Sequence, residues 1–380
     1  MEYNYIIAGA GFYGAVIAER IANDLKKPVL VLEKRNHIGG NCYSEINEET
    51  GIEYHKYGTH IFHTSDEKVW KYINRFTEFN SYYHQVLTTY NDRVYQMPIN
   101  LETINSFYNK NLKPSEVQAF LAKEIEKENL EEKDPENFEE KAISMIGRPL
   151  YEAFIRGYTK KQWGVDPKEL PAAILKRLPF RTNYNESYYF SKWQGIPLEG
   201  YTAIFKKLLA SPLIKVELNS DYLKLRDTLP KDAIVIYSGP IDAYFDYRYG
   251  RLSWRSLEFE ESVVNVPDYQ GTSVMNYGNE EVPFTRIHEP SHLHPEREPH
   301  ASKSLIIKEF SISDDGTNPY YPLSNPRNKE LFERYRQDAE KEPNLIVGGR
   351  LGDYKYYDMH HTIGQALETY EKKIKQGNEF

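Results

Sequence analysis

Short apolar runs alternate with a glycine-rich turn and a helical pattern at the N-terminus of the chain. Residues 3–8 form an apolar run that leads directly into Gly9-Ala10-Gly11-Phe12-Tyr13-Gly14. Residues 15–22 carry apolar side chains at helical spacing, and a second apolar run, residues 29–32, ends at Glu33. The pattern predicts a strand, a tight turn, a helix and a second strand, as in a βαβ unit.

This order of elements is typical of a site for a dinucleotide pyrophosphate. Backbone N–H groups and the positive end of the helix dipole face the anion, and glycine leaves room for its approach. Glu33 is placed to accept hydrogen bonds from a ribose. The alternative is an ordinary tight turn between strand and helix. The pair Gly39-Gly40 permits a further close approach and favours FAD over NAD, unless it is only a flexible loop.

Strand and helix patterns alternate along the rest of the chain. Residues 86–90 and 93–97 alternate in polarity about Asn91-Asp92 and predict a hairpin in a sheet outside the first unit. Helical periodicity covers residues 101–175, and strand-like runs fill residues 257–310. The middle of the chain therefore predicts a helical unit and a separate sheet.

The C-terminal region repeats the arrangement of strand, glycine turn and helix. Residues 344–347 form an apolar run before Gly348-Gly349-Arg350, and Asp358 opens a final helical pattern. A second helix N-terminus can hold the other end of a long cofactor, which again favours FAD.

We therefore expect an α/β protein with a Rossmann-like FAD-binding domain, an inserted helical domain and an antiparallel β-sheet substrate domain. The 380 residues are too many for one small core. The predicted boundaries are residues 1–80, 191–240 and 338–380 for the discontinuous FAD-binding domain, 101–178 for the helical domain, and 81–100, 179–190 and 241–337 for the sheet domain. Repeated prolines predict a mobile substrate loop at about residues 164–181, for which the alternative is a plain surface connection.

Composition and charge exclude several classes of partner. The formal net charge of −8 gives no general attraction to nucleic acid or to an anionic membrane, so local arginines must hold any anionic ligand. Cys42 is the only cysteine, which excludes an intrachain disulfide and is typical of a reducing cytosol. No apolar run has transmembrane length and no signal peptide is recognised, so we expect a cytoplasmic protein without membrane insertion.

Tyrosine is unusually abundant, with 32 residues beside 17 phenylalanines. Its ring stacks on bases and sugars while its hydroxyl binds phosphate. Because most buried aromatic residues are structural, only the tyrosines close to arginine or glycine motifs are candidates for ligand binding.

Six segments together carry a family resemblance. They are residues 33–41 (EKRNHIGGN), 57–63 (YGTHIFH), 157–164 (GYTKKQWG), 239–242 (GPID), 283–286 (PFTR) and 349–352 (GRLG). On these segments the chain resembles the bacterial UDP-galactopyranose mutases over essentially its whole length.

The resemblance implies a reversible, redox-neutral isomerisation of UDP-galactopyranose to UDP-galactofuranose. In that family reduced FAD is the nucleophile, the reaction passes through a flavin–sugar adduct, and the product supplies galactofuranose for cell-surface glycans. This agrees with a sequence that offers no convincing Ser-His-Asp or Cys-His set. The family also implies a homodimer formed through the helical domain.

The resemblance also assigns the substrate-binding residues. Arg177 and Arg286 match diphosphate-binding arginines, a role that suits a permanently charged, two-pronged guanidinium, although each could instead form a surface salt bridge. The family's phosphate-binding phenols match Tyr188, Tyr320 and Tyr356, although the neighbouring Tyr321 leaves the alignment at Tyr320 open. The family's uridine region matches Phe154, Tyr158, Thr159 and Trp163. Another substrate contact matches Asn276.

The cofactor residues follow in the same way. The predicted set is Gly9, Gly11, Tyr13, Gly14, Glu33, Lys34, Gly40, Asn41, His60, Ile61, Asp221, Tyr222, Arg350, Tyr357, Asp358, Met359, His360, His361 and Thr362. Arg350 would oppose the pyrophosphate. Asp358 would lie near the ribityl chain, unless it is a plain helix N-cap.

His60 and His63 are the predicted catalytic histidines beside the flavin ring, and Arg177 and Arg286 complete the catalytic set. The spacing of the two histidines could also suggest a metal pair, but the sequence supplies no further ligands, so we predict no metal. We expect His288, His292, His294 and His300 to form a solvated loop rather than a metal site.

His84 departs from the family pattern, which usually has asparagine near the uridine, and we include it as a substrate contact. Related mutases that also accept UDP-N-acetylgalactosamine change the first histidine of the H-x-x-H motif, so His60 favours galactose. Two other classes stay open. An FAD-dependent oxidoreductase would consume reductant stoichiometrically, and a non-catalytic UDP-sugar binder would purify without flavin.

Overall fold

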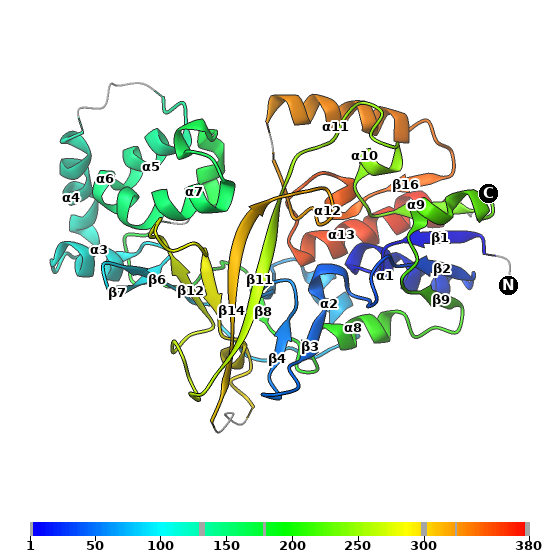
Figure 1. Ribbon diagram of the computed structural model, residues 1–380, viewed down its shortest axis with the longest axis horizontal. Helices are drawn as coiled ribbons and strands as arrows, with labels where there is room; N and C mark the ends of the chain where they lie inside the picture. Colours follow the sequence, from blue (N-terminus) through cyan, green and yellow to red (C-terminus); the bar gives the residue numbers. More distant parts are fainter. Residues whose placement is uncertain (1–2, 129–133, 178–179, 298–301, 324, 377–380) are drawn as a thin grey trace.

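A five-stranded parallel sheet gathers strands from both ends and the middle of the chain (Figure 1). The computed structural model describes residues 3–128, 134–177, 180–297, 302–323 and 325–376. The strand order is β16 (Leu345–Val347), β10 (Ile234–Tyr237), β1 (Tyr5–Ala8), β2 (Val29–Leu32) and β9 (Ile214–Glu217). All neighbouring pairs are parallel, so the carboxyl ends of the strands meet at one edge.

Helices cover both faces of this sheet, because successive residues of a strand point to opposite sides. Ile7, Val29 and Val31 belong to the core beneath α1 (Phe12–Arg20), α8 (Tyr201–Leu208) and α13 (Met359–Thr369). Ile6 and Leu30 pack on the other side with α9 (Tyr222–Leu225). The remaining elements of this region are α2 (Glu67–Ile73), α10 (Ile241–Tyr244), α11 (Pro326–Ala339), α12 (Gly349–Gly352), the 3₁₀ turn η6 (Arg226–Thr228) and the π-helical turns η1 (Ile21–Leu25) and η8 (Tyr370–Lys375).

A seven-stranded sheet lies beside the parallel one. Its order is β15 (Tyr321–Pro322), β11 (Trp254–Val264), β14 (Ser304–Ser313), β13 (Arg286–His288), β12 (Val274–Tyr277), β6 (Val86–Tyr90) and β7 (Arg93–Met97). The pairs are antiparallel except β12 with β6, which are parallel. The expectation of an antiparallel sheet is therefore confirmed apart from this one pair.

Small elements connect the two sheets. They are the hairpin of β3 (Ser44–Ile46) and β4 (Glu53–His55), the pair of β5 (Phe62–Thr64) and β8 (Trp193–Gly195), and the 3₁₀ turns η2 (Gly40–Cys42) and η7 (Pro290–Leu293).

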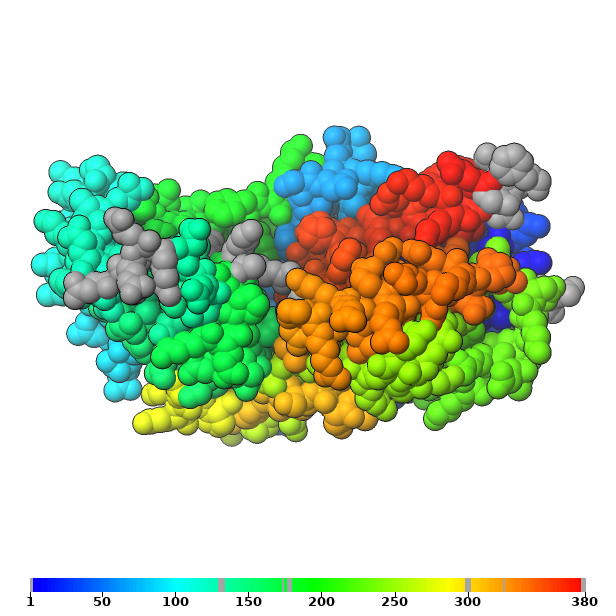
Figure 2. Space-filling view, turned by 90° about the horizontal axis from the view of Figure 1, so that it is seen from above, coloured from blue at the N-terminus to red at the C-terminus, as the bar shows by residue number. Residues whose placement is uncertain are grey.

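A helical unit forms one end of the molecule, and the parallel-sheet region forms the other (Figure 2). It contains α3 (Leu101–Tyr108), α4 (Pro114–Glu126), α5 (Phe138–Ile146), α6 (Arg148–Leu150), η3 (Tyr151–Arg156), α7 (Gly157–Trp163), η4 (Pro167–Glu169) and η5 (Ala172–Arg177). The helix expected at residues 151–156 is present as the π-helical turn η3, which joins α6 to α7. Its core includes Val117, Leu121, Phe138 and Phe154.

Several local predictions are confirmed. The hairpin of β6 and β7 turns at Asn91 and Asp92, whose φ angles of 48° and 58° suit the primed turn of a two-residue hairpin. Within the predicted loop at about residues 164–181, the described residues include the short 3₁₀ helices η4 and η5, and the mobility of the loop stays a prediction. The domain boundaries themselves stay predictions. In the part of the chain that the structure describes, no helix has the length and apolar character needed to cross a membrane.

Candidate active site

In the turn at residues 9–14, the backbone of Gly14 lies very close to the backbone of Gly9. Gly9 has a φ of +108°, and a Cβ on Gly14 would lie 2.1 Å from the carbonyl oxygen of Gly9. Only glycine fits at position 14, because a side chain would collide with main chain that cannot move aside. The turn leads into α1, whose N-cap Gly11 makes no side-chain cap. The first N–H groups of α1 are thus left for an anionic ligand.

A cavity of about 370 Å³, here the turn cavity, opens over this helix N-terminus. Glu33 lies in its wall and is held in place, since its carboxylate accepts hydrogen bonds from the backbone N–H of Ala10 at 2.8 Å and Arg35 at 2.9 Å. The predicted cofactor residues that line the cavity are Gly9, Gly11, Tyr13, Glu33, Lys34, Gly40, Asn41, Asp221, Tyr222, Arg350 and Thr362.

A larger cavity of about 890 Å³, the central cavity, continues from the turn cavity. Gly11, Asn41, Arg350 and Thr362 line both, so the two spaces join over the N-terminus of α1. The central cavity is also lined by the predicted residues His60, Ile61, His63, His84, Tyr188, Asn276, Arg286, Tyr320, Tyr356, Tyr357, Asp358, Met359 and His361.

Arg350 lies where these two cavities join. Its Nη2 atom is buried and, within the described residues, has no hydrogen-bond partner. Its guanidinium carbon lies 4.7 Å from the ring centroid of Tyr320. A buried donor without a partner is costly unless a ligand satisfies it, so this cation fits a pyrophosphate that spans both cavities.

His60 is a neutral hydrogen-bond acceptor toward the central cavity. Its Nδ1 lies 2.6 Å from the carbonyl oxygen of Gly58, which can only accept, so in the neutral ring Nδ1 carries the proton and Nε2 is the acceptor. Burial lowers the pKa of His60 to about 4. The side chain is therefore uncharged at neutral pH.

Asp358 turns toward the cavity rather than capping its own helix. It occupies the N-cap position of α13 but makes no side-chain cap hydrogen bond. Its Oδ2 lies 3.9 Å from Nε2 of His63 and 3.5 Å from Nδ1 of His361. The plain N-cap alternative is therefore wrong. His63, Asp358 and His360 also stand close enough to hold a metal ion, so further ligands do exist near His63.

Arg286 faces the central cavity from β13 with a buried carboxylate behind it. Its Nε lies 3.4 Å from Oε1 of Glu309, and its Nη2 contacts the hydroxyl of Tyr158. Burial opposes both charges, but each group stabilises the charged form of the other. The pKa of Arg286 therefore stands well above its ordinary value. In the same way, Arg286 and His288 lower the pKa of Glu309 to about 2. The pair is ionised at any physiological pH.

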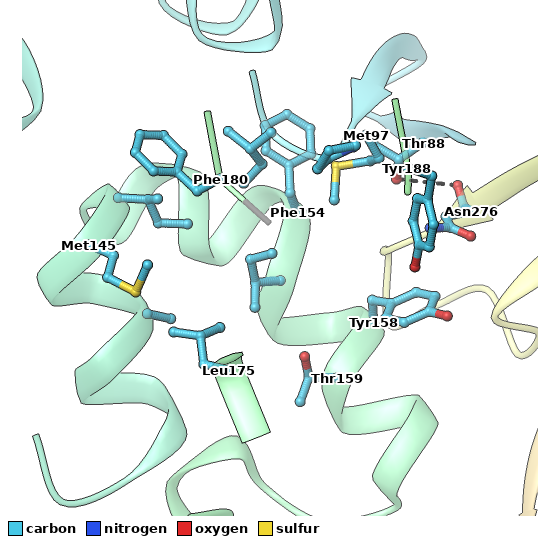
Figure 3. A pocket seen from close by; sticks show the side chains of 15 residues that line it. Thr88, Met97, Met145, Phe154, Tyr158, Thr159, Leu175, Phe180, Tyr188 and Asn276 are labelled. Atoms are coloured by element: carbon cyan, nitrogen blue, oxygen red, sulfur yellow. Dashed lines mark hydrogen bonds between the residues drawn. The ribbon is translucent and has the colours of Figure 1, made fainter. Parts of the chain in front are cut away.

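A third space, the aromatic cavity, lies between the helical unit and the seven-stranded sheet (Figure 3). Phe154, Tyr158 and Thr159 point into it from η3 and α7, while Tyr188 and Asn276 line both this cavity and the central one. The backbone carbonyl of Asn276 accepts a hydrogen bond from Thr88 at 3.3 Å. Flat apolar walls with a few polar groups suit a nucleobase.

The phenols predicted to bind phosphate differ in exposure. Tyr320 is buried and donates to the carbonyl oxygen of Tyr57 at 2.7 Å, whereas Tyr188 and Tyr356 are 36% and 41% exposed. Tyr321 also lines the central cavity and stacks on Tyr356 at 5.3 Å between ring centroids. Both candidates for the register at Tyr320 thus face the same space.

Three predicted residues within the described part of the chain do not line these cavities. Gly14 lies behind the turn, Trp163 packs on the core of the helical unit, and His360 stacks edge-on to His63. Arg177 lies in η5, but its side chain is outside the described part of the chain. Their assignments stay predictions.

The expected solvated histidine loop is wrong for two of its members. His288 is 1% exposed and His294 is 5% exposed. His288 is held between Glu309, at 2.9 Å from its Nε2, and the hydroxyl of Thr59, at 2.8 Å from its Nδ1. His292 lies within reach of Asp268 and Glu289, and His300 falls outside the described residues. Strand β13 and its contacts with β14 account for the burial of His288.

Sequence reasoning missed several residues of the site. Glu309 supports Arg286, Lys161 binds the loop between β12 and β13, and Tyr189 stacks on His63 with 3.7 Å between ring centroids. Glu309 follows Lys308 in β14, and a charged pair of this kind does not distinguish it from an ordinary surface position of a strand. Lys161 and Tyr189 carry no local signal, since their partners are distant in the sequence.

Comparison with known proteins places the chain in a family. The family model described as UDP-galactopyranose mutase matches residues 153–356, and a model of an NAD(P)-binding Rossmann-like domain matches residues 7–76. A solved structure described as reduced UDP-galactopyranose mutase superimposes with a TM-score of 0.77 at 13% identity, covering 99% of this chain and 95% of the other, which shows the shared fold.

The similarity to several relatives covers almost the whole sequence. A probable UDP-galactopyranose mutase of Klebsiella pneumoniae is 43% identical over 96% of this chain and 93% of its own, and the dTDP-fucopyranose mutase of Escherichia coli is 41% identical over 98% and 99%. The UDP-galactopyranose mutase of Mycoplasma pneumoniae is 32% identical over 98% and 97%. The chain therefore belongs to the UDP-galactopyranose mutase family.

Proposed function

We propose that this protein interconverts UDP-galactopyranose and UDP-galactofuranose with reduced FAD as its cofactor. The observation that carries the proposal is a series of three neighbouring spaces, the turn, central and aromatic cavities, in which each shares lining residues with the next. A dinucleotide, a sugar diphosphate and a nucleobase would follow one another along this series, and each space has lining residues of the matching chemistry.

The residues of the turn cavity fit FAD by their shape and charge. Gly9, Gly11 and Gly14 let the pyrophosphate approach the N-terminus of α1, Glu33 would accept from the ribose hydroxyls, and Arg350 would neutralise phosphate. His60, Ile61, Tyr357 and Asp358 would surround the ring system in the central cavity. When bound and reduced, the flavin supplies the nucleophilic nitrogen that this isomerisation requires.

Residues of the chain would hold the departing nucleotide and the open sugar. Arg286, with Arg177, would bind the diphosphate so that UDP stays in the site after its bond to the sugar breaks. The Nε2 atom of His60 can accept a hydrogen bond from a donor in the central cavity. Phe154, Tyr158 and Thr159 would hold the uracil and exclude water from one side of the site.

The decisive experiment is chromatographic. Purified protein reduced with dithionite is incubated with UDP-galactofuranose, and we expect conversion to UDP-galactopyranose without net consumption of reductant. Protein stripped of flavin is the matched control and should be inactive. Absence of UDP-galactopyranose from the reduced sample would exclude the proposed reaction, and stoichiometric loss of reductant would indicate an oxidoreductase.

A second candidate substrate is a dTDP-linked 6-deoxy sugar, because the Escherichia coli relative is named for dTDP-fucopyranose. The aromatic cavity supports this alternative through Met97, Met145 and Ile155, which could contact the methyl group of thymine. The same assay with dTDP-fucofuranose separates the candidates by the ratio of kcat/KM. We expect the uridine substrate to be preferred, and a higher value for the thymidine substrate would reverse the assignment.

The proposal also includes a cytoplasmic homodimer that contacts its partner through the helical unit. The family resemblance supports the dimer, and the single cysteine supports a reducing compartment. Light scattering after size-exclusion chromatography tests the oligomeric state, for which we expect twice the chain mass of 44.6 kDa.

A further inference from the structure

Lys161 is held by an unusual set of partners. Its Nζ atom lies 2.6 Å from the carbonyl oxygen of Tyr277 and 2.9 Å from those of Asn279, Val282 and Phe284. All four acceptors are backbone oxygens of one loop. An ammonium that binds four carbonyls fixes the path of that loop, because oxygens brought so close together would otherwise repel one another.

The loop that Lys161 binds carries two predicted substrate residues at its base. The loop 277–284 runs from the last residue of β12 to the residue before Thr285, which precedes β13. Asn276 lies directly opposite Arg286 in the register of these strands. The backbone N–H of Tyr277 also donates to the carbonyl of Thr285 at 2.9 Å, which closes the base of the loop. The conformation of the loop therefore sets how Asn276 and Arg286 face the central cavity.

The helix on the other side of this contact carries the predicted nucleobase residues. Lys161 lies in α7, three residues after Tyr158 and two after Thr159. A Cβ on Gly157 would lie 2.1 Å from the carbonyl oxygen of Gly278, so the start of α7 and the loop are in direct backbone contact. Lys161 itself lines none of the three cavities, so it can affect a ligand only through other residues.

We propose that Lys161 is a positioning residue that locks the loop 277–284 onto α7. Through this contact, Asn276 and Arg286 on the strands and Tyr158 and Thr159 on α7 all face the same nucleotide sugar. Because the ligand in question is the nucleotide sugar, this inference rests on the proposed function. It adds a residue that joins the base-binding helix to the diphosphate-binding strands.

The test measures UDP affinity and turnover separately. In Lys161→Met, which keeps the length of the side chain but lacks the donors, we expect UDP binding to flavin-loaded protein to weaken by on the order of tenfold to a hundredfold. The loss should appear in KM, with kcat at saturation and flavin content close to wild type. Lys160→Met is the matched control. Within the described residues Lys160 pairs with the side chain of Glu280 in the same loop, at 2.7 Å, but this ion pair is 44% and 38% exposed and contributes little, so its loss should change the affinity by less than about threefold.

Chemical rescue distinguishes positioning from general stabilisation. Lys161→Ala leaves four carbonyl oxygens around a vacated ammonium site, and carbonyl groups of this kind replace the water around potassium. We expect potassium or ammonium ions to restore part of the lost UDP affinity, and lithium to have no effect. If the UDP affinity falls only because the variant is generally destabilised, these cations should not differ in their effect.

Each outcome decides between the two proposals. Wild-type protein that fails to bind UDP contradicts the proposed function. Wild-type binding together with unchanged affinity in both Lys161 variants overturns the role of Lys161 alone. Recovery of both variants only as unfolded protein also overturns it, because Lys161 would then serve folding and not the position of Asn276 and Arg286.

Discussion

The two ends of the candidate site are built in different ways. Around the turn cavity the important atoms belong to the backbone: the N–H groups at the start of α1, and the close approach of Gly14 to Gly9. Around the aromatic cavity and its border with the central cavity they belong to side chains from separate elements, such as Arg286 on β13, Tyr158 on α7 and Glu309 on β14.

This difference determines how each end responds to change. A backbone site depends on a few positions where any side chain is excluded, so one substitution removes the whole site. A site of side chains depends on networks, in which removing one group leaves its partners unsatisfied but the fold intact. Substitutions at the first end should therefore affect folding and flavin, and substitutions at the second should affect turnover.

Gly14→Val should have the largest effect. The new side chain would collide with the carbonyl of Gly9, so we expect the free energy of unfolding to fall by about 4 kcal/mol or more and bound flavin to be lost. Denaturant unfolding and the flavin absorbance measure both. The control is Gly364→Ala in α13, where a Cβ meets only Val69 at 3.5 Å and stability should change by less than about 1 kcal/mol. Retention of flavin by Gly14→Val would contradict the backbone model.

Arg286→Ala should have the next largest effect, mainly on turnover, together with a loss of stability because buried Glu309 loses its guanidinium partner. Losing a charge that binds the diphosphate is expected to lower kcat/KM by on the order of a thousandfold, about 4 kcal/mol, with flavin still bound. Arg336→Ala is the control, since Arg336 pairs with exposed Glu333 and Glu340 on α11 and should leave activity unchanged. Activity near wild type in Arg286→Ala would remove Arg286 from the diphosphate site.

Glu309→Gln tests the network behind Arg286. The buried guanidinium loses its anionic partner, so we expect the unliganded protein to lose about 3 kcal/mol of stability. UDP should then raise the Tm of the variant more than that of wild type, because the diphosphate supplies a replacement anion. An equal shift in both proteins would show that UDP does not reach Arg286.

His84→Asn should have the smallest effect, which depends on pH. Burial lowers the pKa of His84 to about 3, so the unfolded chain binds a proton at this residue between about pH 6.5 and pH 3 and the folded protein does not. Stability should therefore fall as pH falls below 6.5, by up to about 1.4 kcal/mol per pH unit from this residue. Denaturant unfolding between pH 6.5 and 5 should show a shallower slope in His84→Asn, and identical slopes would contradict a neutral, buried His84.

The backbone end of the site could be predicted from the sequence in detail. The glycine turn, both of its strands, α1 and Glu33 follow from local spacing, because a βαβ unit is defined by contacts between residues that are near in the sequence. The hairpin at Asn91 and Asp92 was predictable for the same reason. The parallel pairing of β12 with β6 was not, since nothing local records which distant strand lies alongside.

The side-chain end could be predicted only through family resemblance. Arg286, Tyr158 and Asn276 have no local feature that separates them from structural residues. Two of the segments that resemble the family contain Tyr158 and Arg286, and Asn276 was assigned by the resemblance along the rest of the chain. Glu309 and Lys161 lie behind these residues and touch no ligand space, so neither composition nor spacing indicates them. The burial of His288 was missed because a histidine-rich stretch suggests solvent until the strand beside it is known.

The gathering of distant strands in the parallel sheet has a consequence for synthesis on the ribosome. When the chain has been made as far as Glu340, every strand of the seven-stranded sheet and the whole helical unit have been translated, but β16 and α13 have not. Until then α1, which is buried in the complete protein, lacks the helix α13 that packs against it. A premature stop in the last tenth of the coding sequence would therefore leave the seven-stranded sheet and the helical unit complete, but would remove β16, α13 and the predicted ligand residues from Arg350 to Thr362.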